Sequence, residues 1–161
     1  MREEPKWVSA DHVQRLHDRA IQATGGAAGV RDKDLLESAV ARPQNLYAYE
    51  GETDHFQLAA SYAEGIAKNH PFVDGNKRSA FLTADLFLSC NGYSLDATPH
   101  DRHAEKMVAL AEGTLDRAQF AHHLSEHSVR IEQTRTRTSP GDRLRRFRDQ
   151  LSKTRDDDRE R

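Results

Sequence analysis

Apolar residues recur three and four positions apart along the first 125 residues, and no segment alternates apolar and polar residues over a sustained run. Spacings of three and four are typical of amphipathic helices, whereas alternation would indicate half-buried strands. The sequence therefore predicts an all-α fold, a bundle of about six helices. We expect these helices over residues 9–25, 32–42, 54–69, 77–89 and 98–113, with a sixth around 120–124.

The helix expected over residues 77–89 is apolar nearly all round. Phe81, Ala84 and Leu88 share one side, and Leu82 and Leu86 lie on the other. A helix with this pattern is buried. We therefore expect it to be the central helix of the bundle.

A loop is expected between the second and third helices. Proline disfavours a helical conformation in the residue before it, so Pro43 should end the second helix. The next ten residues, QNLYAYEGET, contain two tyrosines and a glycine and have no helical period. We interpret them as a loop or short hairpin that forms a flap.

The net charge divides the chain into two parts. Residues 1–125 carry 13 basic and 18 acidic side chains, a net charge of −5, whereas residues 126–161 carry 11 and 8, a net charge of +3. We predict one domain over 1–125 and a charged, flexible C-terminal extension over 126–161. Within the extension, the spacing of Leu144, Phe147 and Leu151 predicts a short amphipathic helix at about 142–152.

Several partners and compartments are disfavoured by composition. The formal charge of the whole chain, −2, gives no reason to expect a nucleic acid or an acidic membrane as partner. A single cysteine, Cys90, excludes an internal disulfide framework and a multi-cysteine zinc site. The chain has no basic region followed by an apolar stretch at its start and no run of 18 apolar residues. We therefore expect a soluble, cytoplasmic protein.

The segment HPFVDGNKR, residues 70–78, joins the third and fourth expected helices and suits a phosphate ligand. Gly75 and Asn76 stand at the start of a helix, where unpaired N–H groups and a partial positive charge attract anions. Lys77 adds a point charge, and Arg78 adds a planar, two-pronged donor. The four residues are therefore candidates for binding a nucleotide through its phosphates.

Two further side chains complete a candidate catalytic set. Asp74 can hold a Mg²⁺ ion that bridges phosphate oxygens, and His70 can act as general base toward a hydroxyl nucleophile. The alternative interpretation is structural, a capped helix start whose charges are solvated. We favour the catalytic interpretation for the whole segment, because a buried helix has no need to begin with so many polar side chains.

These nine residues resemble the signature of the Fic/Doc, or Fido, superfamily, which has the form H-P-F-x-[D/E]-G-N-[G/K]-R. The lysine at position 77 is the mark of the Doc, or death-on-curing, branch. The stretches LHDRAIQATGG, RPQNLYAYEG and ADLFLSCNGYSL also look similar to Doc proteins, so the resemblance covers roughly residues 8–125.

The resemblance implies a Fido-type helical fold and a toxin from a toxin–antitoxin pair, with a Phd-like antitoxin as partner. It further implies a protein kinase that uses ATP and Mg²⁺. Such a kinase transfers the γ-phosphate to a serine or threonine hydroxyl of a translation factor, with elongation factor Tu as the expected target. Translation would stop as a result.

The resemblance also assigns roles to individual residues. His70 would deprotonate the acceptor hydroxyl, and Asp74 would hold Mg²⁺. The phosphates would be gripped by Gly75, Asn76, Lys77 and Arg78. The flap that aligns the target segment would consist of Leu46, Tyr47, Ala48, Tyr49, Glu50, Gly51, Glu52 and Thr53.

Adenylylation is the main alternative, because most Fic proteins transfer AMP from ATP to a protein hydroxyl. Relatives with that activity often carry a second arginine three residues after the first, and this chain has Phe81 there, which disfavours AMP transfer. Some relatives silence themselves with an inhibitory helix of the form [S/T]-x-x-x-E-[G/N]. Ser128 and Glu132 nearly fit that form, but inhibition by a separate antitoxin is favoured.

Three other interpretations compete with the kinase. Arg117 and His122 fit the R-x4-H pattern of a class of helical ribonuclease toxins, although such a pair occurs often by chance. His122, His123 and His127 are interpreted as solvated helix residues rather than a metal cluster, because no acidic or thiol partner stands at ligand spacing. An inactive interaction module is the third alternative, and an intact His70 and Asp74 argue against it.

Overall fold

The computed structural model describes residues 3–96 and 102–131. The prediction of a mainly helical fold with six helices is confirmed. The helices are α1 (Ala10–Thr24), α2 (Lys33–Glu50), α3 (His55–Asn69), α4 (Asn76–Cys90), α5 (Arg102–Glu112) and α6 (Arg117–Glu126), and the two short strands are β1 (Tyr93–Leu95) and β2 (Ser128–Arg130).

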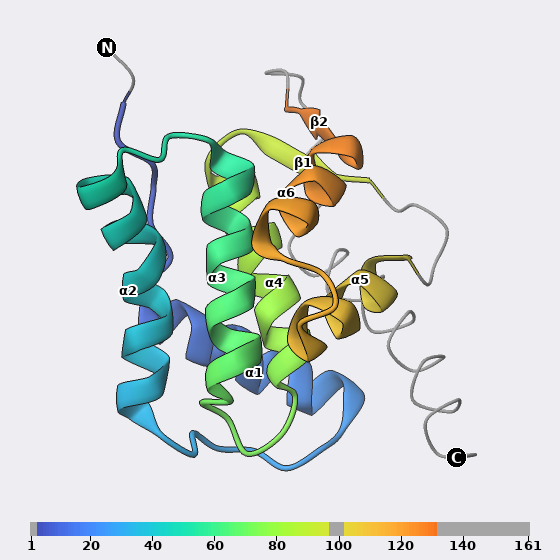
Figure 1. Cartoon of the computed structure of the whole chain (residues 1–161). Coiled ribbons are helices and arrows are strands. Elements are labelled where there is room, and N and C mark those ends of the chain that lie inside the picture. The colour runs from blue at the N-terminus through green and yellow to red at the C-terminus, as the bar shows by residue number, and fades with distance from the viewer. Residues whose placement is uncertain (1–2, 97–101, 132–161) are drawn as a thin grey trace.

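Helix α3 lies between α2 and α4 (Figure 1) and also contacts α5 and α6. The neighbouring helices approach α3 closely because many of its buried residues are alanine or glycine. A Cβ atom at Gly65 would lie 3.2 Å from the Cα of Ala39, so the backbones of α2 and α3 are almost in contact. Helix α4, which the sequence predicts to be central, packs beside α3 and is buried along most of its length. The two helices together form the centre of the bundle.

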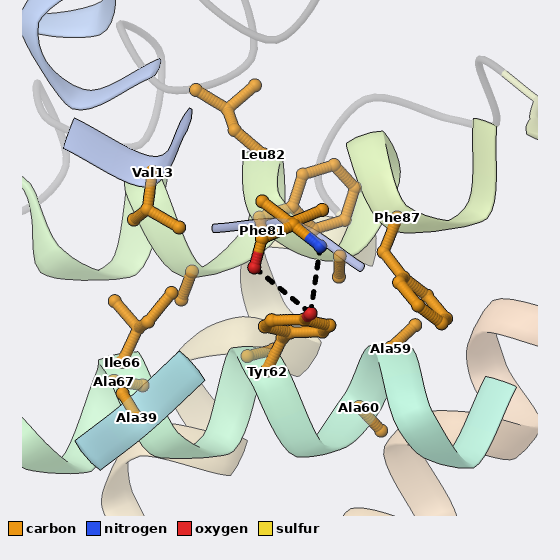
Figure 2. Packing of buried hydrophobic residues seen from close by; sticks show 14 of the residues in the cluster. Val13, Ala39, Ala59, Ala60, Tyr62, Ile66, Ala67, Phe81, Leu82 and Phe87 are labelled. Carbon is orange, nitrogen blue, oxygen red and sulfur yellow. Dashed lines mark hydrogen bonds between the residues drawn. The ribbon is translucent and has the colours of Figure 1, made fainter. Parts of the chain in front are cut away.

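The segment before α1 is tied to the core by Tyr62 of α3. The Tyr62 hydroxyl accepts a hydrogen bond from the N–H of Val8 (2.9 Å) and donates one to the Val8 carbonyl oxygen (3.1 Å), as Figure 2 shows. Burial raises the pKa of Tyr62 to about 12, because the charged phenolate is disfavoured away from water. The neutral hydroxyl thus satisfies both backbone groups of Val8.

The helix starts predicted at Ser9, Asp32 and Asp54 are confirmed. Each of these residues is an N-cap whose side chain accepts a hydrogen bond from a backbone N–H two or three residues later. The helix start predicted at residues 98–99 and the helix predicted at 142–152 lie outside the described residues. No helix in the described part of the chain is long and apolar enough to cross a membrane.

The loop predicted between the second and third helices is wrong over most of its length, because α2 continues through Pro43 to Glu50. A proline inside a helix removes one hydrogen bond. However, Pro43 and Leu46 are buried on the face of α2 that also carries Ala39, and this burial offsets the missing bond. The helix ends at Gly51, a left-handed residue (φ 70°) whose N–H bonds to the carbonyl of Leu46.

The antiparallel pair of β1 and β2 has no counterpart in the sequence prediction. Ser94 lies opposite Val129 in the pair. Strands of three residues are too short to show the alternation by which strands are recognised. Because β2 lies beyond residue 125, the folded part of the chain extends into the segment predicted to be a flexible extension, as far as Arg130.

Candidate active site

The motif segment, residues 70–75, links the end of α3 to the start of α4. His70 is the C-cap of α3 and is left-handed, with φ 50° and ψ 55°. It is the one residue other than glycine with a positive φ in residues 3–96 and 102–131. This conformation is costly for a residue with a side chain, so the surrounding structure must hold it. The His70 side chain is exposed.

The α1–α2 loop, residues 25–32, lies against the motif segment at one end of the bundle (Figure 1). The N–H of Val73 donates to the carbonyl of Gly29 (3.1 Å). Val30 and Phe72 form an isolated antiparallel bridge. Backbone groups of the two loops therefore fix one another.

Arg31 of this loop holds the turn at His70. Its Nε donates to the carbonyl of His70 (2.8 Å), and its guanidinium also donates to the carbonyl of Asn69 (3.1 Å). The backbone N–H of Arg31 donates to the carbonyl of Pro71 (2.7 Å). One residue thus satisfies three successive carbonyl groups around the costly left-handed turn.

Asn76 braces the motif segment from inside. Its Oδ1 accepts a hydrogen bond from the N–H of Phe72 (2.9 Å), and its Nδ2 donates to the carbonyl of the same residue (3.0 Å). The amide side chain is therefore occupied by backbone. In a phosphate site, Asn76 would therefore act through the shape of the loop and not through its side chain.

The start of α4 differs from the other helix starts in the described residues that have a defined cap. The N-caps of α1, α2, α3 and α6 each accept a hydrogen bond through a side-chain oxygen, whereas the N-cap of α4 is Gly75, with φ 76° and no side-chain hydrogen bond. Gly75 therefore has no side-chain oxygen to accept from the first N–H groups of α4, as is common where a helix terminus binds an anion. Lys77, in the first turn, is exposed.

Asp74 stands immediately before this helix start. Its Oδ1 accepts from the N–H of Gly75 (2.7 Å) and lies 3.9 Å from the guanidinium of Arg78, and its Oδ2 accepts from the N–H of Ala27 (3.3 Å). The side chain is 41% exposed. The carboxylate is therefore held in place while one side of it remains open to solvent.

Arg78 is buried and spans α4 and the end of α1. Its guanidinium donates to the hydroxyl of Thr24 and to the carbonyl of Gly25 (3.1 Å). Gly26 lies against both Asp74 and Arg78. A Cβ atom at this position would lie 2.5 Å from Oδ2 of Asp74, so any other residue at position 26 would require the carboxylate to move.

These residues fit a Mg²⁺ ion that is shared with a nucleotide. Mg²⁺ is commonly bound by one or two carboxylates together with phosphate oxygens and water, and Asp74 offers one partly open carboxylate beside an uncapped helix start. In the described residues, no group of three or more His, Cys, Asp or Glu side chains has the geometry to hold a metal ion.

The segment predicted as a target-aligning flap, residues 46–53, lies at the other end of α3 from the motif segment (Figure 1). Helix α3 has 15 residues, or about 22 Å of length. Leu46 is buried and Tyr47 packs against Trp7, whereas Tyr49 is exposed. The structure does not bring this segment to the motif. The segment that does lie there is the α1–α2 loop.

Three residues of the site are missing from the sequence prediction, namely His17, Thr24 and Arg31. Arg31 lies outside the stretches that resemble Doc proteins, and Thr24 lies inside LHDRAIQATGG, where the resemblance assigned it no role. The contacts of both residues join segments that are far apart in the sequence. His17 did carry a signal. It lies on the apolar face of α1 with Val13 and Ile21, where a polar side chain needs an explanation.

The geometry gives little support to AMP transfer or to self-inhibition. Phe81 stands where many AMP-transferring relatives have the second arginine. Its side chain is buried, and the centroid of its ring lies 5.1 Å from that of the His103 ring. The inhibitory helix would begin at Ser128, but Ser128–Arg130 is the strand β2. Glu132 lies outside the described residues.

The structure also does not bring together the two residues of the R-x4-H ribonuclease pattern. Arg117 and His122 both lie on α6 and are five residues apart. Since each residue turns a helix by about 100°, their side chains leave the helix in directions that differ by about 140°. Nε2 of His122 is instead paired with Glu126 (2.9 Å). The interpretation of His123 as solvated is wrong, because His123 is buried against His103 and Phe120.

The chain is similar in sequence to known proteins. A model of the Fic/DOC family matches residues 7–88, just over half of the chain, including the motif segment. The chain is 36% identical to "Protein kinase doc" of Escherichia phage P1 over 108 residues, which are 67% of this chain and 84% of the relative. It is 41% identical to "Toxin Doc" of Mycolicibacterium smegmatis over 87 residues, which are 53% of this chain and 67% of the relative.

Proposed function

The chain belongs to the Fic/Doc family, and from this membership we propose that it is a Doc-type toxin acting as a protein kinase. It transfers the γ-phosphate of ATP to a serine or threonine hydroxyl of a translation factor, and translation stops. The names of the two relatives, a protein kinase and a toxin, support this proposal.

One observation carries the proposal. The helix start at Gly75 is left uncapped while an exposed His70, a partly open Asp74 and an exposed Lys77 surround it. A purely structural helix start would use a side-chain cap, as four other helices of this protein do. The uncapped N–H groups and the lysine suit a polyphosphate.

His70 serves as the general base. The hydroxyl oxygen of the target forms a bond to the γ-phosphorus, while the bond between that phosphorus and the bridging oxygen breaks and ADP leaves. The hydroxyl proton passes to a ring nitrogen of His70. Because the His70 backbone is fixed by Arg31, the ring has a defined origin from which to reach the hydroxyl.

Asp74 would hold the Mg²⁺ ion, through the side of its carboxylate that faces solvent. When bound, the ion neutralises charge on the phosphate oxygens during transfer. The N–H groups of Gly75 and Ala27 fix the carboxylate, so it needs little reorganisation on binding.

The α1–α2 loop takes the target-aligning role that the resemblance to Doc proteins implied for residues 46–53. It is exposed over residues 25–29 and already pairs with the motif segment through Val30 and Phe72. A peptide laid along this loop would bring its hydroxyl close to His70. Elongation factor Tu is the proposed target.

The toxin is proposed to act together with a Phd-like antitoxin. Uncontrolled phosphorylation of a translation factor would arrest the producing cell, so a partner must restrain it. Co-expression of the antitoxin is expected to restore growth to cells that express this chain, and the His70→Ala variant is expected to need no rescue.

Mass spectrometry tests the target. The purified protein and its His70→Ala variant are each incubated with elongation factor Tu, ATP and Mg²⁺. We expect one phosphorylated serine or threonine with the unchanged protein and none with the variant. An unmodified elongation factor Tu, beside a phosphorylated protein in a cell lysate, would reject this target and retain the kinase.

A further inference from the structure

His17 of α1 is fully buried and makes one hydrogen bond with the motif segment. Its Nε2 lies 2.7 Å from the backbone carbonyl oxygen of Asp74. A carbonyl oxygen only accepts, so Nε2 must carry the hydrogen. The other ring nitrogen, Nδ1, has no hydrogen-bond partner and lies 3.8 Å from a carboxylate oxygen of Asp18. The buried imidazole of His17 thus makes a single hydrogen bond, to the motif segment.

The ring of His17 is itself held by the motif segment. It stacks on Phe72, with ring centroids 3.8 Å apart and an interplanar angle of 3°. The backbone of Phe72 is fixed in turn by the side chain of Asn76, and its ring is buried. The stack leaves the imidazole little freedom to rotate, so the direction of its Nε2–H bond is defined.

The carbonyl that His17 holds belongs to the peptide unit between Asp74 and Gly75. The N–H of the same unit is that of Gly75, which donates to Oδ1 of Asp74 (2.7 Å). Because the unit is planar, fixing its oxygen also fixes the direction of its N–H. Gly75 has φ 76° and no side chain, so sterics alone permit this peptide to rotate.

We propose that His17 is a positioning residue, which locks the Asp74–Gly75 peptide so that the Asp74 carboxylate and the first N–H groups of α4 keep their directions. The consequence for ligands rests on the proposed function. If Mg²⁺ and ATP bind here, loss of the lock weakens their binding, although His17 touches neither.

Two substitutions separate the hydrogen bond from the packing. His17→Phe keeps a ring against Phe72 and removes the donor, whereas His17→Gln removes the ring and places an amide donor near the position of Nε2. Asp18→Asn is the matched control, because it changes the neighbour of Nδ1 and leaves the bond to Asp74 intact. Thermal unfolding of each variant shows which of them are folded.

The first readouts need no nucleotide. Nitrogen NMR of the unchanged protein should show the Nε2–H tautomer of His17, and the Nδ1–H tautomer would overturn the proposal whatever the variants do. In a folded His17→Phe, the Gly75 amide should exchange with solvent at least about fivefold faster, as expected for a lost hydrogen bond. His17→Gln and Asp18→Asn should stay within about twofold of the unchanged protein. Equal exchange in all four proteins would also overturn the proposal.

Calorimetry then tests the ligand consequence. Binding of ATP in the presence of Mg²⁺ should weaken about fivefold to tenfold in His17→Phe and recover in His17→Gln, in line with the energy of one hydrogen bond. Failure of the unchanged protein to bind Mg²⁺ and ATP would count against the proposed function. The tautomer and the Gly75 exchange rate decide the role of His17 in either case.

Discussion

His103 and His123 share a hydrogen bond inside the protein, with Nδ1 of His103 2.8 Å from Nε2 of His123. The bond joins α5 to α6, and the other nitrogen of His103 lies 3.3 Å from the carbonyl of Asp96. His127 lies beside both rings. Of the two nitrogens that share this bond, one must carry the hydrogen and the other must accept it. The two rings together can therefore take up at most one additional proton without losing the bond.

Acid should therefore destabilise the protein through this pair. Burial, with the neighbouring His103, His127, Lys106 and Arg102, lowers the pKa of His123 to about 3, and burial also lowers the pKa of His103. In the unfolded chain the imidazole of His123 takes up a proton near pH 6.5, whereas in the folded chain it stays neutral down to about pH 3. The contribution of His123 to the free energy of unfolding is therefore fully present above about pH 6.5 and is lost as the pH decreases toward 3. At pH 5 we expect a loss of about 1–2 kcal/mol from His123.

Urea denaturation from pH 7.5 to 4.5 measures this effect. A His123→Phe variant should lose part of the pH dependence, whereas a variant of the exposed His122, His122→Gln, should keep it. Parallel pH profiles for His123→Phe and the unchanged protein would contradict the assignment.

Gly26→Ala should damage the site with little effect on the rest of the fold. The new Cβ would lie 2.5 Å from Oδ2 of Asp74, so the carboxylate has to move. We expect the Mg²⁺ concentration for half-maximal kinase activity to rise at least about tenfold, equivalent to about 1.4 kcal/mol. Gly113→Ala is the control, because Gly113 also has a positive φ but a Cβ there would meet no atom within 4 Å. Equal effects of the two substitutions would show that backbone strain alone is responsible.

The α1–α2 loop, and not the segment at residues 46–53, should determine recognition of the target. Ala28→Glu, in the exposed part of the loop, is expected to raise the KM for the protein target about tenfold and to leave ATP binding unchanged. Tyr49→Ala, at an exposed position in the last turn of α2, is expected to change neither. Steady-state kinetics with varied target concentration gives both values, and the reverse pattern would restore the segment at 46–53 as the flap.

Lys77 should contribute to γ-phosphate transfer. Its exposed side chain stands in the first turn of α4, where glycine would remove both a charge and bulk. Lys77→Gly is expected to lower the rate of γ-transfer, and Lys77→Arg, which keeps the charge, to lower it less. Unchanged kinase activity in Lys77→Gly would remove lysine as a determinant of how the nucleotide binds.

The helices were predictable because their signals are local. Ser9, Asp32 and Asp54 mark helix starts in the sequence by the same side-chain oxygens that cap them in the structure. Pro43 misled the prediction for the same reason. Its local preference to end a helix is outweighed by burial of Pro43 and Leu46 against the core, which the local sequence does not reveal.

The sequence predicted the motif residues of the candidate site, but not the residues that hold them in place. The residues from His70 to Arg78 are contiguous, so their chemistry can be recognised together. Arg31 and Gly29 act on the motif segment largely through backbone carbonyl and N–H groups some 40 residues away in sequence, and such bonds leave no residue pattern. His123 shows the same limit, since its polar side chain suggests a solvated position while its buried partner, His103, lies on another helix.

The central claim is that His70 and the start of α4 transfer the γ-phosphate of ATP. The most direct test incubates the protein and its His70→Ala variant with a cell lysate and ATP that is labelled at either the α or the γ phosphate. We predict protein-bound label from γ-labelled ATP alone, and none with His70→Ala. Label from α-labelled ATP would show AMP transfer, and absence of label from both would contradict the enzymatic function itself.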